Sequence, residues 1–221
     1  SARDELDGSL GRMGFDHVDL IYAMPPPAGL PMDGLVEQVA GLIESGRARA
    51  WGTGMWSAEQ HHEALDLCQR AGAPPPVAAQ MATSLADHAG PTDDAMRRAF
   101  DRGIGLVASY VLAGGTLTGK YDRGEAGRAS DDTSSVIARG KQLAVRVVAL
   151  AEAWDVPPAH VAFAYAFQHP NLASVLFGAS TPEQLAENVA AWSTFTLLDG
   201  AQRRAILHLA DDDHVADDHL A

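Results

Sequence analysis

The chain has 221 residues, of which 47% are hydrophobic, a composition that supports one sizeable hydrophobic core. Its formal net charge of −13 at pH 7 argues against a nucleic-acid or anionic-membrane partner, because no basic face could easily offset that excess. The single cysteine, Cys68, excludes a disulfide framework and a cysteine zinc site, and the absence of a membrane-length apolar run or a signal peptide completes the expectation of a soluble cytoplasmic protein.

Strand and helix signals alternate along the chain. In order, the sequence predicts a helix at 3–13, a strand at 17–24, a helix at 32–47, a strand at 48–55, a helix at 57–71, a strand at 76–82, a helix at 93–102, a strand at 104–111, helices at 137–154 and 158–168, a strand at 174–177 and a helix at 182–191. A glycine-rich polar segment at 114–135 follows the fourth strand.

This alternation predicts an α/β protein with parallel strands, either an open doubly wound sheet or a closed barrel. About five strands are expected, which is fewer than the eight of a closed barrel. In both architectures, chemistry belongs at the carboxyl ends of the strands. We expect one domain over residues 1–210 and an acidic, disordered tail at 211–221, although His214 or His219 could hold a cation there with the neighbouring carboxylates.

The last strand runs through a glycine into a polar helix, which is either an anion site or an ordinary strand-turn-helix. Thr181 or Ser180 can cap that helix, and Gln184, Glu187 and Asn188 share one of its faces because residues three and four apart are neighbours.

Two pairs of adjacent residues that contain histidine are candidate sites. His61 and His62 are adjacent on a predicted helix and point about 100° apart, which is poor metal geometry, so surface positions and no metal are expected. Asp87 and His88 could form an acid-base pair, but adjacent side chains rarely face one another and solvated loop residues are the favoured interpretation.

Four stretches together resemble the aldo-keto reductases, especially the branch that contains the β subunits of voltage-gated potassium channels. SLGRMGFDHVDLIYAMPPP is similar to the family's helix and fourth barrel strand, and LIESGRARAWGTGMWSAEQ to its fifth-strand region. GIGLVASYVLAGGTLTGKYDRG resembles the seventh strand with its cofactor loop, and VLFGASTPEQLAEN the eighth strand with the adenosine-binding helix. The resemblance implies an incomplete (β/α) barrel, about the last two thirds of a family barrel.

At the positions that match the family's catalytic and nicotinamide-binding residues, this sequence differs from the family pattern. The family's tyrosine, lysine and aspartate come from strands that precede the matched region, and Met24 stands at the place of the catalytic histidine. A thioether can neither donate a proton nor carry charge. Gly54 and Met55 replace the Ser-Asn pair that holds the nicotinamide carboxamide, and Ser109 replaces the stacking aromatic residue.

Other matched positions keep the family's pattern. Gln80 matches the carboxamide-binding glutamine, and the loop LAGGTLTGK keeps glycines that let backbone N–H groups approach a pyrophosphate, with Lys120 adding a point charge. The cofactor-binding residues that the resemblance implies are Gln80, Leu112, Gly114, Lys120, Ser180, Gln184, Glu187 and Asn188. Gln184 replaces the arginine of many members, so whether NADP still binds, or the motif is an inherited scaffold, stays open.

Several side chains near the strand ends are candidates for a ligand site. Tyr22 and Met24 share a face by the strand's period of two. The substrate-binding candidates are Tyr22, Met24, Trp56, Gln80 and Tyr110, and Tyr22 and Tyr110 are the catalytic candidates because a phenol can orient an oxygenated ligand.

Three functions fit these observations. The first is a repurposed aldo-keto-reductase-like protein that binds a small organic molecule and catalyses, if anything, a non-redox cyclisation, dehydration or isomerisation. The second is an NADPH-dependent reductase whose first strands are supplied elsewhere, and the third is a non-catalytic partner protein. Because an incomplete barrel leaves strand edges and apolar surface open, we also expect a homodimer.

Overall fold

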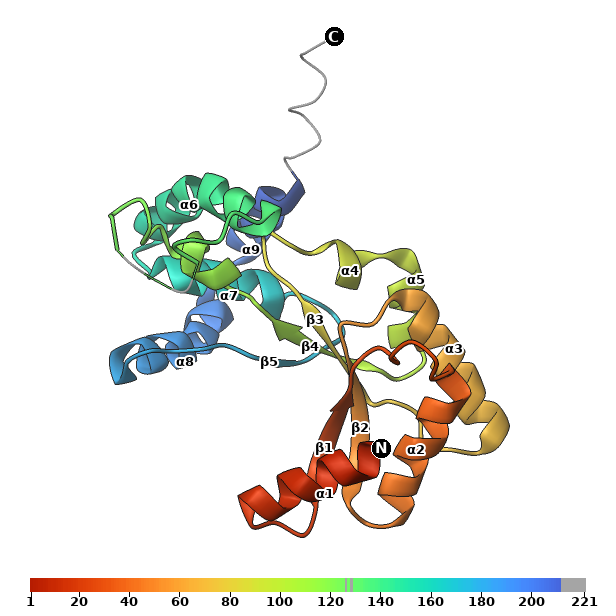
Figure 1. Ribbon diagram of the computed structural model, residues 1–221. Helices are drawn as coiled ribbons and strands as arrows, with labels where there is room; N and C mark the ends of the chain where they lie inside the picture. The colour runs from red at the N-terminus through yellow and green to blue at the C-terminus, as the bar shows by residue number, and fades with distance from the viewer. Residues whose placement is uncertain (126, 128, 212–221) are drawn as a thin grey trace. The chain divides into compact units, whose positions relative to one another are not determined.

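The computed structural model describes residues 1–125, 127 and 129–211 (Figure 1). Its elements are α1 (Ala2–Met13), β1 (Val18–Ala23), α2 (Met32–Glu44), β2 (Ala48–Gly54), α3 (Ala58–Ala71), β3 (Ala78–Ala82), α4 (Ala89–Thr92), α5 (Asp94–Phe100), β4 (Gly105–Ser109), the 3₁₀ helix η1 (Ala113–Thr118), α6 (Ser135–Trp154), α7 (Pro158–Phe167), β5 (Leu172–Val175), α8 (Pro182–Leu197) and α9 (Gly200–Asp211). The strands are hydrogen-bonded neighbours in chain order, with β1 parallel to β2 and β2 parallel to β3. The predicted α/β fold is confirmed.

Most predicted elements occur within a few residues of their expected bounds. The largest differences are at the end of the chain, where the strand expected at 174–177 lies at Leu172–Val175 and the helix expected at 182–191 continues to Leu197. The sequence did not predict helix α9. It follows Asp199, whose carboxylate accepts hydrogen bonds from the backbone N–H groups of Ala201 and Gln202, both at 2.8 Å. None of the helices in the described part of the chain is long and apolar enough to cross a membrane.

The chain divides into two compact units. The first comprises Ser1–Met81 and Gly90–Val107, and the second comprises Ala82–Ala89 and Ala108–Ala221. The single domain expected over residues 1–210 therefore stays a prediction. The acidic tail, including His214 and His219, lies outside the described residues, except for Asp211, which ends α9.

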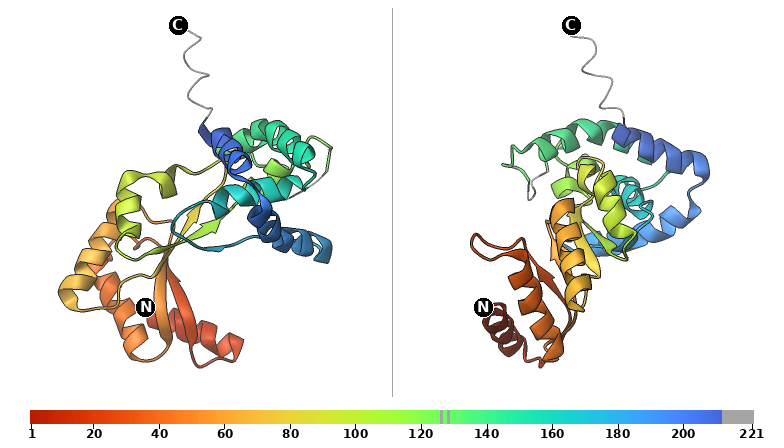
Figure 2. Two further views of the ribbon diagram at one scale, coloured as in Figure 1. Left: turned by 180° about the vertical axis from the view of Figure 1, so that it is seen from behind. Right: turned by 90° about the vertical axis from the view of Figure 1, so that its right-hand side faces the viewer.

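The first unit holds β1, β2, β3 and the helices α1, α2, α3 and α5. The register places Tyr22 opposite Gly52 and Gly54 opposite Gln80. Helices α2 and α3 pack side by side (Figure 2). The buried members of the core in this unit are Met32, Leu35, Val36, Val39, Trp51, Trp56, Ala64 and Cys68.

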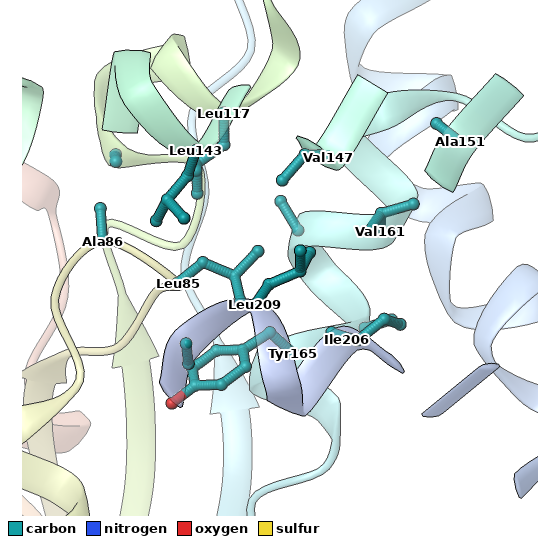
Figure 3. Packing of buried hydrophobic residues seen from close by; sticks show 14 of the residues in the cluster. Leu85, Ala86, Leu117, Leu143, Val147, Ala151, Val161, Tyr165, Ile206 and Leu209 are labelled. Carbon is teal, nitrogen blue, oxygen red and sulfur yellow. The ribbon is translucent and has the colours of Figure 1, made fainter. Parts of the chain in front are cut away.

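The second unit holds the helices from η1 onward. Helix α7 packs against α8, and α6 packs against both α7 and η1. The approach of α6 to η1 depends on Gly140, because a Cβ at that position would collide with the side chain of Thr116. Figure 3 shows the core of this unit, where side chains of η1, α6, α7 and α9 meet Leu85 from the segment after β3.

Candidate functional site

Side chains at the end of β1 lie over two glycines of β2. The Sδ atom of Met24 is 2.9 Å from the point where a Cβ would stand at Gly54, and Cε1 of Tyr22 is 3.0 Å from the corresponding point at Gly52. Both glycines therefore leave space that side chains of the neighbouring strand fill. Tyr22 and Met24 share a face, as the period of two predicts.

This end of β1 and β2 presents exposed apolar side chains. The exposed fraction is 38% for Tyr22, 58% for Met24 and 60% for Met55. Partial burial raises the pKa of the Tyr22 phenol above its ordinary value of 10.0. Like any tyrosine hydroxyl, it is protonated at neutral pH and can donate a hydrogen bond.

Met55 has an unusual backbone conformation. Its φ of 60° lies in the left-handed region, which a side chain with a Cβ seldom adopts, and its N–H donates to the carbonyl oxygen of Gln80 at 3.2 Å. This bond ties the residue after β2 to the half-buried Gln80 of β3. Strained backbone of this kind concentrates at binding and catalytic sites.

Trp56 lies in the core. Its side chain is only 3% exposed, and its ring centroid is 6.0 Å from that of Trp51 and 5.7 Å from that of His61. Its Nε1 atom is buried and has no hydrogen-bond partner among the described residues. This burial counts against Trp56 as a substrate-binding residue, because almost none of its ring faces solvent.

The expectation that His61 lies at the surface was wrong. His61 is fully buried, and its Nδ1 and Nε2 atoms lie 2.8 Å from the Ser57 carbonyl oxygen and 2.7 Å from Thr53 Oγ1. Because a carbonyl can only accept, Nδ1 carries the proton and Nε2 accepts from the threonine hydroxyl. Burial lowers the pKa of His61, and the nearby His62 lowers it further, while the bond to Ser57 opposes them.

His62 and His88 also contact other parts of the fold. The half-buried His62 bonds to the carbonyl oxygen of Ala95 at 2.9 Å, and the ring of His88 packs edge-on against Tyr165 with centroids 5.7 Å apart. Among the described residues there is no group of three or more His, Cys, Asp or Glu that could hold a metal ion.

In the second unit, the segment after β4 is a loop of left-handed residues. Tyr110 (φ 59°) is 40% exposed, and Gly114, Gly115 and Gly119 have φ values of 67°, 88° and 71°. The hydroxyl of Tyr110 lies 3.2 Å from where a Cβ would stand at Gly114. The structure thus brings Tyr110, Leu112 and Gly114 into one tight turn, in which glycines take most of the left-handed positions at little steric cost.

The remaining candidates gather at the start of α8. Thr181 is the N-cap and accepts from the N–H of Gln184 at 3.2 Å, while the Gln184 side chain accepts from the N–H of Ser180 at 2.9 Å. Asn188 is 7% exposed, and its side chain donates to the carbonyl oxygen of Gly178 at 3.5 Å. The four predicted residues Ser180, Gln184, Glu187 and Asn188 therefore belong to one strand-to-helix connection.

His160 contributes to this connection, although the sequence gives no signal for it. Its Nε2 lies 2.8 Å from the backbone oxygen of Glu187, and its Nδ1 lies 2.7 Å from Thr194 Oγ1. His160 belongs to α7 and is 5% exposed, so a buried side chain of one helix holds two turns of the next.

The fold and these residues define a recognisable class. A model of the aldo/keto reductase family matches residues 1–206, and the chain belongs to that family. It is 31% identical over 205 residues to a rice (Oryza sativa subsp. japonica) protein named "Probable voltage-gated potassium channel subunit beta", and 30% identical over 202 residues to an Arabidopsis thaliana protein of the same name. These matches cover 87% and 86% of this chain but 62% and 61% of the relatives, so the chain spans less than two thirds of their length.

Proposed function

We propose that this member of the aldo/keto reductase family binds a small organic molecule at the carboxyl ends of its strands and does not carry out ordinary carbonyl reduction. The observation that carries the proposal is Met24, which stands where the resemblance places the catalytic histidine and which is 58% exposed, on the same face as Tyr22. A thioether supplies a polarizable contact surface and no acid. Hydride transfer to a carbonyl needs an acid placed at the oxygen.

Any catalysis at this site would be a non-redox step such as a cyclisation, dehydration or isomerisation. Tyr22 is the candidate catalytic residue in the first unit, because its phenol is 38% exposed and can donate a hydrogen bond to an oxygenated ligand. Tyr110 is the candidate in the second unit, where a left-handed backbone holds its half-exposed side chain. Gln80 and Met55 would complete the polar and apolar contacts on the side of β2 and β3.

The second candidate function is NADPH-dependent reduction, and the loop after β4 favours it. The family usually binds NADP(H), and the residues of the second unit fit the phosphate end of that cofactor, since left-handed glycines and a lysine flank the turn. Leu112, Gly114 and Lys120 would hold its pyrophosphate, and Ser180, Gln184, Glu187 and Asn188 its adenosine. When bound, the cofactor supplies hydride. At the other end, Gly54 offers no side chain to hold a nicotinamide.

One set of measurements separates the two candidates. The purified chain is titrated with NADPH while cofactor fluorescence and aldehyde-dependent oxidation are followed, and co-purifying small molecules are identified by mass spectrometry. The proposal expects an organic ligand whose affinity falls in Tyr22→Phe or Met24→Ala, with no aldehyde turnover. Micromolar NADPH affinity together with aldehyde turnover by the chain alone would overturn it in favour of the reductase.

Self-association is the last part of the proposal. Strand β5 is the final strand in the sheet order, and Leu185, Val189 and Trp192 of α8 are 50%, 61% and 54% exposed. An outer strand and exposed apolar side chains are both surfaces that other protein tends to cover. We expect a dimer, and we expect it in a reducing cytoplasm, because the single thiol is free and buried.

A further inference from the structure

The six methionines of the chain fall into two groups by exposure. Three are buried in the fold, with exposed fractions of 6%, 9% and 1%: Met32, Met81 and Met96. The other three have exposed fractions of 48%, 58% and 60%: Met13, Met24 and Met55. Buried methionines fill gaps in an apolar core, whereas an exposed thioether is open to oxidation by solutes.

Two of the exposed methionines follow neighbouring strands of the first unit. Met24 comes directly after β1 and Met55 directly after β2, and these two strands are parallel neighbours in the sheet. Adjacent strands lie about 4.8 Å apart, so both methionines belong to the same end of this strand pair. Met13 is instead the last residue of α1.

The fold keeps both of these side chains outside the core. Sδ of Met24 lies 2.9 Å from the point where a Cβ would stand at Gly54, so its sulfur rests against glycine while more than half of the residue faces solvent. Met55 is held by the bond from its N–H to the carbonyl oxygen of Gln80, in a left-handed backbone conformation. An oxygen atom added to either side chain can therefore be accommodated without entering the core.

The single thiol of the chain is protected from the same chemistry. Cys68 is 1% exposed, and burial raises the pKa of its thiol, although a hydrogen bond with its own backbone opposes the shift. The thiolate is the reactive form of cysteine, and buried structural cysteines are inert. The sulfur atoms that solutes can reach therefore belong to methionines.

We propose that Met24 and Met55 are sites of reversible oxidation, which converts the end of β1 and β2 from an apolar surface into a polar one. The oxidant is hydrogen peroxide or another two-electron oxidant. A lone pair of the sulfur attacks one peroxide oxygen, and the O–O bond breaks as the S–O bond forms. The departing hydroxide takes the proton of the transferred oxygen and leaves as water, so the sulfur is oxidised by two electrons and the peroxide is reduced. Methionine sulfoxide reductases reverse the change with electrons from thiols.

Oxidation changes what this surface can bind. A thioether offers an apolar, polarizable contact, whereas a sulfoxide is polar and chiral. This consequence rests on the proposed function, in which an organic molecule binds beside Tyr22 and Met24. Loss of the apolar contact of one methionine should weaken binding of an apolar molecule about tenfold, because burial of such a side chain is a large part of the binding free energy.

Peptide mass spectrometry of the whole chain during treatment with dilute hydrogen peroxide tests the modification. Met24 and Met55 should each gain one oxygen atom at least about five times faster than Met81 and Met96, in proportion to their exposure. Methionine sulfoxide reductase with dithiothreitol should then remove both oxygen atoms. Met13 is the exposed reference, and oxidation of Met13 with Met24 and Met55 intact would overturn the proposal.

Binding of the uncharged apolar dye Nile red, followed by its fluorescence, tests the consequence. The readout for each protein is the ratio of its affinities before and after peroxide treatment. The wild-type chain and Met13→Leu should lose affinity about tenfold. A double variant that carries Met24→Leu and Met55→Leu should lose none, because leucine is apolar and cannot be oxidised. An equal loss in all three proteins, or no loss in the wild type, would overturn the switch.

The modification and the proposed function can fail separately. Selective sulfoxides at Met24 and Met55 in a chain that does not bind Nile red before treatment would support the oxidation sites and reject the apolar ligand surface. Dye binding that survives full oxidation of both methionines would reject the switch and leave the proposed ligand surface standing.

Discussion

The sulfur atom of Met24 lies over Gly54 at a distance that leaves no room for a Cβ. Two residues earlier on β1, Tyr22 has the same relationship with Gly52. The two sites differ in their surroundings, because a Cβ added at Gly52 would also lie 2.8 Å from the backbone oxygen of Ala78. A side chain can rotate away from an added methyl group, but the backbone of β3 cannot.

Alanine substitutions in β2 should therefore have unequal effects. We expect Gly52→Ala to lower the free energy of unfolding by about 1–3 kcal/mol, the usual cost of overpacking, and Gly54→Ala to lower it by less than about 0.5 kcal/mol as the exposed Met24 side chain moves. Urea denaturation followed by tryptophan fluorescence measures both values, and the two variants serve as controls for each other. Equal losses would show that Met24 is as rigid as the backbone beside Gly52.

His61 should make stability sensitive to acid. Its pKa is lowered in the folded protein, so the unfolded chain takes up a proton near the ordinary histidine value of 6.5 before the folded protein does. The stabilisation is fully present above that pH and is lost as the pH falls through the lowered pKa. His61→Leu should cost about 1–3 kcal/mol at pH 8, because Thr53 and the Ser57 carbonyl lose their partner, and should reduce the pH dependence between 7 and 5. His62→Gln is the matched control, and a slope unchanged in His61→Leu would contradict the assignment.

Tyr165 should make stability sensitive to alkali. Burial raises its pKa to about 12, with Asp211 adding to the shift and Arg139 opposing it. A tyrosine with a raised pKa stabilises the fold below about pH 10, and this contribution of roughly 2–3 kcal/mol is lost as the pH rises toward 12. Tyr165→Phe should flatten the alkaline part of the stability curve, measured by denaturation at several pH values. Ionisation of the native Tyr165 at pH 10, seen by ultraviolet absorbance, would disprove the burial effect.

The exposed apolar residues of α8, Leu185, Val189 and Trp192, should control self-association. We expect the chain to scatter light as a dimer at low micromolar concentration, and Leu185→Glu or Val189→Glu to produce monomers by placing a charge in an apolar contact. Leu207→Glu adds the same charge to a 40% exposed position on α9 and should leave the dimer intact. A folded wild-type monomer, or a dimer that both α8 variants retain, would contradict the prediction.

The fold could be predicted largely from local patterns. Alternating apolar runs and amphipathic stripes define the strands and helices, and glycine-rich sequence identifies the turn after β4. Helix α9 was not predicted, because it begins at Gly200 and glycine is a common sign of a loop. The Asp199 carboxylate, just before the helix, accepts a hydrogen bond from the N–H of Ala201 in its first turn.

Some features of the candidate site could be predicted from the sequence and others could not. The shared face of Tyr22 and Met24 followed from the strand period, since it depends on neighbouring positions alone. The burial of Trp56 and His61 depends on how α3 packs on β2, which position in the sequence does not reveal. The sequence did carry a signal for the burial of His61, because Ala64, Leu65 and Cys68 follow it at helical spacing and lie on the same face of α3.

The two hydrogen bonds of His160 have a mechanical meaning. Glu187 and Thr194 are seven residues apart, which is about two helical turns, and the imidazole ring of His160 is hydrogen-bonded to both. Helix α8 cannot slide or roll on α7 without breaking at least one of these bonds. These bonds therefore couple the two helices at two points, and a displacement of α8 would disturb His160 of α7.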